Sequence, residues 1–233
     1  MSRTAAQLER FFERLAEGRR DAAERALSRL RRDAPDSRER SLAEVEWLRA
    51  SSGEDAADPA LKAHVEAWPD DADALHLWGA RRLELGHPRE AAEIWLRVRR
   101  LDEAADRREG VGGPAQVALV VRVAEAVLGG LHEPFRSGLA SVPVVVEDRP
   151  SETLVESGFD PRAYGLFEGP DQAWASSLDA PPSPSRIVLF TNNLLADFPD
   201  HADLEAQVEI TVLHEVGHYF GLDEDDLERM GLD

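Results

Sequence analysis

The chain contains no cysteine, and this absence excludes a disulfide-stapled fold among its 233 residues. A cysteine-free protein suits a reducing compartment, so we expect a cytoplasmic location, although such a chain would also survive elsewhere. Long apolar runs are missing too: no stretch could span a bilayer, and residues 1–18 carry charges at helical spacing instead of an apolar leader with a cleavage site. These absences predict a soluble protein.

Lysine is nearly absent, since Lys62 is the single lysine among 27 basic residues, which we take as a mark of a GC-rich bacterial genome. Acidic residues outnumber basic ones by 46 to 27, which gives a formal net charge of −19. Nucleic acids and anionic membranes are themselves negative, so this charge argues against both as main partners. The 42% of hydrophobic residues can build ordinary cores, and the length fits two compact domains.

A metal-binding pattern lies near the C-terminus, in the run HEVGHYFGLDE that begins at His214. Residues four apart on a helix lie one above the other, so His214 and His218 can reach one metal ion. Glu215 is turned about 100° around the helix and suits a general base facing the water at the metal. Gly221 can end the helix in a left-handed conformation and return the chain toward the metal, which makes Glu224 the best-placed third ligand.

This ligand set predicts a catalytic Zn²⁺ site. Such sites hold three protein ligands and keep a fourth position for water, whose pKa the metal lowers toward roughly 7. The third ligand stays open between Glu224 and the neighbouring Asp225, because the segment is rich in acids. Tyr219 could steady an oxyanion, but it directly follows His218 and adjacent helical positions face different directions. We assign none of the other histidines to the metal: His64, His76, His87, His132 and His201.

From about Ala124 onward, the chain resembles the minimal zincin-like metallopeptidases. The resemblance rests on residues 142–150 (VPVVVEDRP), 164–169 (YGLFEG), 186–190 (RIVLF) and 211–222 (TVLHEVGHYFGL). It implies a short mixed sheet packed against the motif helix, with His214 and His218 as ligands and Glu215 as catalytic acid and base. The family usually has aspartate as third ligand, whereas this chain has Glu224.

Periodicity places several elements around the motif. Residues 115–128 show the apolar stripe of an amphipathic helix, and residues 142–147 and 186–190 are apolar runs of strand length, with 163–167 as a weaker third strand. Residues 179–185 contain three prolines, must be extended or looped, and could border the substrate cleft. Asn192 and Asn193 suit a cap or turn better than catalysis.

The N-terminal half repeats at a fixed interval: Pro35 and Pro69 are 34 residues apart, and Gly18 and Gly86 are separated by twice that distance. This spacing resembles the tetratricopeptide repeat (TPR), a pair of helices with small residues where they cross. The second unit departs from the pattern, with a long loop expected at residues 51–58 and a helix restarting at Asp58 and Pro59. The array either binds a protein segment or only packs on its neighbour.

We therefore predict an α+β chain. A TPR-like helical repeat domain occupies residues 1–109, a glycine-rich linker residues 110–114, and a small zincin-like domain residues 115–233, with its short mixed sheet on the motif helix. The leading functional hypothesis is a zinc-dependent metallopeptidase whose repeats recruit a peptide or protein. Two alternatives remain: a TPR binding module that holds metal without turnover, and an interaction protein with a vestigial metal motif.

Overall fold

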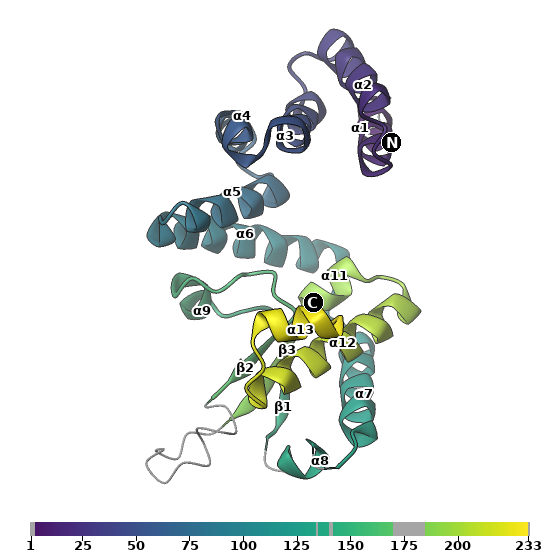
Figure 1. The fold of residues 1–233 in the computed structure, drawn as a ribbon, viewed down its shortest axis with the longest axis vertical. Helices are drawn as coiled ribbons and strands as arrows, with labels where there is room; N and C mark the ends of the chain where they lie inside the picture. Colours follow the sequence, from purple (N-terminus) through teal and green to yellow (C-terminus); the bar gives the residue numbers. More distant parts are fainter. Residues whose placement is uncertain (1–2, 134, 140–141, 170–184, 233) are drawn as a thin grey trace. The chain divides into compact units, whose positions relative to one another are not determined.

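The computed structural model describes residues 3–133, 135–139, 142–169 and 185–232. Of the proline-rich segment expected to border the cleft, residues 179–184 lie outside the described residues. The N-terminal region is helical, as the repeat pattern predicts (Figure 1). Its helices are α1 Arg3–Ala16, α2 Arg20–Asp33, α3 Arg38–Ser52, α4 Glu54–Ala67, α5 Ala72–Glu84 and α6 Pro88–Glu109.

The turns of the first and third helix pairs are made by glycines. Gly18 joins α1 to α2 with φ +70°, and Gly86 joins α5 to α6 with φ +79°, a conformation that glycine adopts at least cost. At Gly79 a Cβ atom would lie 2.4 Å from the ring of Trp95, so only glycine lets α5 and α6 approach this closely. The predicted helix pairs are present; their assignment as TPR units remains a prediction.

The second helix pair, α3 and α4, differs from the sequence prediction at its turn. The long loop predicted at residues 51–58 is wrong, because α3 runs to Ser52 and α4 begins at Glu54. Gly53, with φ +88°, makes the turn alone. Asp58 is no N-cap: its carboxylate accepts a hydrogen bond from Arg81 Nε on α5 (2.8 Å). Pro59 lies inside α4, where it removes one intrahelical hydrogen bond.

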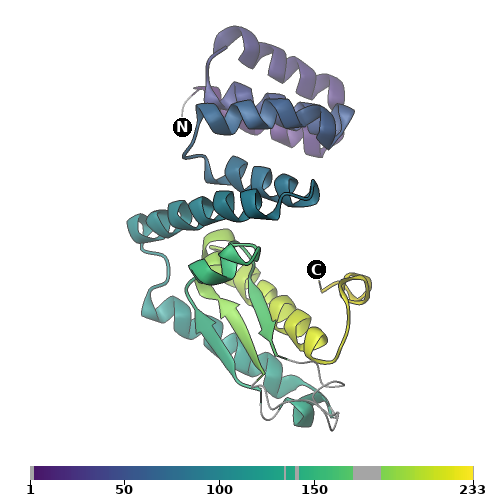
Figure 2. The same ribbon diagram turned by 90° about the vertical axis from the view of Figure 1, so that its left-hand side faces the viewer.

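The C-terminal region combines helices with a small sheet (Figure 2). The sheet has strand order β1-β3-β2; β1 runs parallel to β3 and β2 antiparallel to it, which is the mixed sheet expected. Both β1 and β2 are therefore edge strands of this sheet. The elements are α7 Pro114–Gly130, α8 Phe135–Gly138, β1 Val144–Glu147, α9 Glu152–Glu156, β2 Gly165–Glu168, β3 Arg186–Phe190, α11 Thr191–Asp197, α12 His201–Tyr219 and α13 Glu224–Met230.

Helix α12 packs on α7 and on strands β2 and β3. Asp200 caps its N-terminus by accepting hydrogen bonds from the backbone N–H groups of Ala202 and Asp203, and Gly221, with φ +84°, follows its end. Fully buried side chains of α12, β3 and α7 meet in one core, including Val208, Val212, Leu189 and Val120. This core holds α12 against the sheet and so fixes the helix that carries the histidine pair.

By internal contacts, the described residues form two compact units, Met1–Val98 and Arg99–Asp233. Residues 99–109 of α6 thus belong with the second unit. Residues 110–113 form the turn between α6 and α7, and Pro114, expected in the linker, is the first residue of α7. Within the described ranges, no single helix is long and apolar enough to cross a membrane; only the bent pair α6 and α7, taken together, meets that test.

Candidate metal centre

His214 and His218 lie one turn apart near the end of α12 and point at the same space. Their Nε2 atoms are 3.0 Å apart, and the rings meet edge to face with centroids separated by 4.6 Å. Both side chains are about three-quarters buried, with 22% and 27% of their surface exposed. The helical spacing predicted this convergence, and the structure confirms it.

Each ring is held by a backbone carbonyl at its other nitrogen. His214 Nδ1 donates to the carbonyl of Leu232 (2.6 Å), and His218 Nδ1 donates to the carbonyl of Leu222 (3.1 Å). A carbonyl oxygen can only accept, so Nδ1 carries a proton in both rings, and in a neutral imidazole this leaves the lone pair on Nε2. The two Nε2 atoms, 3.0 Å apart, therefore face the same space, where a single cation could be bound by both.

Glu224 completes the group. It is the first residue of α13, and its carboxylate oxygens lie 3.7 Å from His214 Nε2 and 3.4 Å from His218 Nε2. Tetrahedral zinc with Zn–N bonds of about 2.0–2.1 Å keeps its ligand atoms roughly 3.3 Å apart. The three separations are close to that value, so the residues fit a zinc ion. Among the described residues, His214, His218 and Glu224 form the one group with metal-ligand geometry; Asp225 is not part of it.

Helix α13 reaches this position through a contact that the sequence pattern did not reveal. Leu227 is fully buried, and its Cδ2 atom lies 2.4 Å from where a Cβ atom of residue 217 would be. Gly217 therefore provides the notch into which α13 docks. Asp223 caps the helix by accepting a hydrogen bond from the backbone N–H of Asp226 (2.9 Å), which leaves the next residue, Glu224, to face the histidines.

Glu215 lies beneath strand β2 and is 6% exposed. Burial raises its pKa to about 7, while the electrostatic interaction with His214 and a hydrogen bond from the backbone N–H of Phe167 oppose that rise. A cation held by the histidines would lower the pKa again. The carboxylate has room because Gly165 has no side chain: a Cβ atom there would lie 2.8 Å from Glu215 Oε1. Neither Gly165 nor Phe167 carried a sequence signal for this role.

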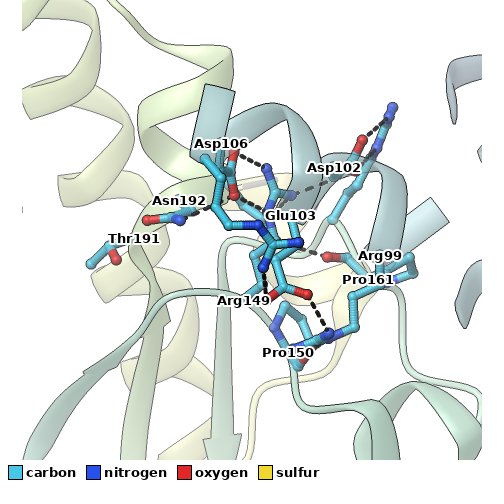
Figure 3. A network of polar contacts seen from close by, with 12 residues as sticks. Arg99, Asp102, Glu103, Asp106, Arg149, Pro150, Pro161, Thr191 and Asn192 are labelled. Carbon is cyan, nitrogen blue, oxygen red and sulfur yellow. Dashed lines mark hydrogen bonds and ion pairs between the residues drawn. The ribbon is translucent and has the colours of Figure 1, made fainter. Parts of the chain in front are cut away.

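A buried polar network fixes the chain that enters β2 (Figure 3). Arg149, just after β1, donates two hydrogen bonds to the carboxylate of Asp106 (2.6 and 2.8 Å) and another to Asn193. Asn193 in turn donates to the carbonyls of Pro161 (3.0 Å) and Ala163 (2.6 Å). Since β2 begins at Gly165, this network holds the strand that covers Glu215.

The other residues considered from the sequence lie outside the metal-binding group and make structural contacts or lie at the surface. The hydroxyl of Tyr219 donates to the carbonyl of Gly138 (2.9 Å), so it turns away from the histidine pair. Asn192 and Asn193 lie in α11, buried in the network around Arg149. His64 is fully buried in the first unit, and His201 is exposed at the start of α12.

Residues 139–232 match the family model of zincin-like metallopeptidases. The matched segment contains all three strands, α12 and α13, and hence every residue of the His214 group. It covers less than half of the chain, and no family model confirms TPR units in the helical N-terminal region. No curated protein matches the chain. The family resemblance of the C-terminal domain is thereby supported, and it implies a metal, typically zinc, and a peptide or protein substrate.

Proposed function

We propose that the zincin-like domain is a zinc-dependent peptidase. The observation that carries the proposal is the convergence of His214, His218 and Glu224, with each Nδ1 held by a backbone carbonyl so that each Nε2 faces the shared space. When bound there, Zn²⁺ supplies a Lewis acid that acidifies water and polarises a carbonyl oxygen. The two carbonyls behind the histidines orient the rings and raise their basicity.

Glu215 moves the proton in this proposal. Its carboxylate takes a proton from the attacking water and later gives it to the nitrogen of the departing amine. Burial beneath Gly165 makes the carboxylate a better base than an exposed glutamate, because the charged form is poorly solvated. The backbone N–H of Phe167 holds the carboxylate in place through both transfers.

In this proposal, the peptide substrate binds along strand β2. As an edge strand beside Glu215, β2 offers main-chain groups to an extended peptide. A cavity of about 180 Å³ next to Glu215 is lined partly by Ile210, Gly165 and Leu232, and it suits a small apolar side chain of the substrate.

The test compares wild type with Glu215→Gln in cleavage of fluorescently quenched casein. We expect wild type to cleave casein, to lose activity with a chelator, and to regain it with Zn²⁺. Glu215→Gln should keep its zinc and lose at least about a hundredfold in rate, the usual contribution of a general base. Glu209→Gln, an exposed position on the same helix, is the matched control and should cleave like wild type. Undiminished cleavage by Glu215→Gln would overturn the proposal.

The alternative is a protein-binding chain whose metal domain does not turn over. It predicts zinc retention in wild type and in Glu215→Gln, with no cleavage by either. The same two measurements, zinc content and casein cleavage, therefore separate the peptidase from a metal-holding binding module.

A further inference from the structure

Charge is unevenly distributed along this acidic chain. Residues 3–33, which form α1, α2 and their turn, carry nine arginines against six acidic residues, while the whole chain has a net charge of −19. The first helix pair is therefore positively charged within a strongly negative protein. This segregation lies in the first unit, and the zinc proposal makes no use of it.

The arginines gather at a groove of about 360 Å³ between α1 and α2. Positions 3, 7, 10 and 14 follow one face of α1, and the groove is completed from α2. Five arginines line it: Arg3, Arg10, Arg14, Arg29 and Arg32. Among the described residues, Arg10, Arg14 and Arg29 form no ion pair with an acidic group, so their charges are available to a ligand.

The groove already binds one carboxylate of the chain itself. Asp33, at the end of α2, accepts hydrogen bonds from Arg32 Nε (3.2 Å) and Gln7 Nε2 (3.3 Å), with Arg3 at 3.7 Å. This local arrangement shows the chemistry that the lining recognises: a carboxylate held by guanidinium and amide donors. The unpaired arginines extend the same chemistry along the groove.

Gln7 also offers an acceptor. Its Oε1 atom is buried and has no hydrogen-bond partner among the described residues. A buried carbonyl oxygen without a donor is unfavourable, and the N–H group of a peptide main chain would satisfy it. A carboxylate or sulfate group carries no such donor, so Gln7 favours a ligand whose carboxylates are accompanied by main-chain N–H groups, as in an acidic peptide.

We propose that the groove between α1 and α2 binds a carboxylate-rich segment of a partner protein. The arginines pair with the side-chain carboxylates, and Gln7 accepts from the segment's main chain. A nucleic acid is disfavoured because its phosphodiester backbone has no N–H donor for the Gln7 oxygen. The proposal concerns the first helix pair alone, and it stands whether or not the zinc site cleaves peptides.

Fluorescence polarisation with the full chain tests this site. The probes are a labelled peptide in which glutamate alternates with serine, its glutamine counterpart, and a single-stranded oligonucleotide of equal charge. We expect wild type to bind the glutamate peptide, with affinity falling as salt rises. Replacing Arg10, Arg14 and Arg29 together by glutamine should weaken binding about tenfold or more, because three surface charge pairs are lost.

The matched control replaces Arg89, Arg108 and Arg122 by glutamine. These arginines are exposed on α6 and α7, and the control changes the net charge by the same amount. It should bind the glutamate peptide as wild type does. The proposal is overturned if neither peptide binds at low salt, if both triple variants lose affinity equally, or if the oligonucleotide binds as tightly with the same dependence on Arg10, Arg14 and Arg29.

Discussion

The carboxylate of Glu215 can lie beneath β2 because Gly165 carries no side chain. We predict that Gly165→Ala displaces this carboxylate, since the new Cβ would lie 2.8 Å from both Glu215 Oε1 and Thr211 Cγ2. A displacement of about 1 Å at a catalytic group can cost on the order of a hundredfold in rate. Casein cleavage should therefore fall strongly while zinc content stays near one per chain. Gly129→Ala, where nothing lies within 4 Å, is the control; equal rates for both variants would contradict this role.

A second residue-scale feature is the buried carboxylate of Asp71 in the first unit. It accepts hydrogen bonds from His64 Nε2 (2.8 Å) and Arg38 Nε (2.6 Å), while His64 Nδ1 contacts Ser41 Oγ (3.0 Å). Burial alone would raise the pKa of Asp71, but the hydrogen bonds from His64 and Arg38 outweigh it and hold the pKa well below its usual range. The network joins α3 and α4 to the start of α5.

Asp71 should therefore make stability depend on pH. A carboxyl whose pKa is lower in the folded state contributes stability above its unfolded pKa of about 4 and loses it as the pH falls toward the folded value. We predict that Asp71→Asn destabilises the first unit by about 3 kcal/mol at pH 7, and that the difference from wild type shrinks below about pH 4. Thermal unfolding across pH measures this. Asp36→Asn, exposed and unpaired, should show no such difference; a constant gap at all pH values would be inconsistent with the network.

At the scale of elements, the docking of α13 on α12 assembles the metal centre. The segment after α12 supplies the carbonyls of Leu222 and Leu232 and the carboxylate of Glu224, and buried Leu227 holds it in the Gly217 notch. Without this docking the histidines would lose their orientation and their third partner.

We predict that Gly217→Ala and a chain ending after Gly231 each bind zinc roughly 10- to 100-fold more weakly, as expected for lost ligand-orienting contacts. Competition with a chromogenic chelator gives the affinities. The control is Met230→Ala in α13, because the Met230 side chain is 62% exposed and this substitution should leave the zinc affinity unchanged. Wild-type affinity in both altered chains would show that α13 docking does not set the site.

Sequence patterns predicted most of the helices and strands, but they predicted few of the contacts between them. Periodicity and spacing of side chains predicted the strands at 144–147 and 186–190, the helix α7 and the histidine pair. Gly165, Gly217 and the two carbonyls act through missing side chains or main-chain atoms, so no residue pattern marks them. The loop expected before Asp58 failed because Gly53 makes the turn in one residue and Arg81 engages Asp58 from another helix.

At the scale of the whole molecule, the chain contains two compact units, and the group of His214, His218 and Glu224 found among the described residues lies in the second. We predict two thermal transitions by calorimetry. Zinc at a hundred times its Kd adds about 2.7 kcal/mol to the unit that binds it, which raises one transition by roughly 8 °C. Gly79→Ala, whose Cβ would clash with Trp95, should lower the other transition alone. One transition moved by both changes would contradict independent units.

The zinc content of the purified protein tests the central claim most directly. Elemental analysis after dialysis against trace-metal-free buffer should find about one zinc per chain in wild type and in Glu215→Gln, and almost none in His218→Ala, because the second histidine ligand is then missing. Absence of zinc from wild type after reloading, or its retention by His218→Ala, would contradict the assignment of His214, His218 and Glu224 as the metal centre.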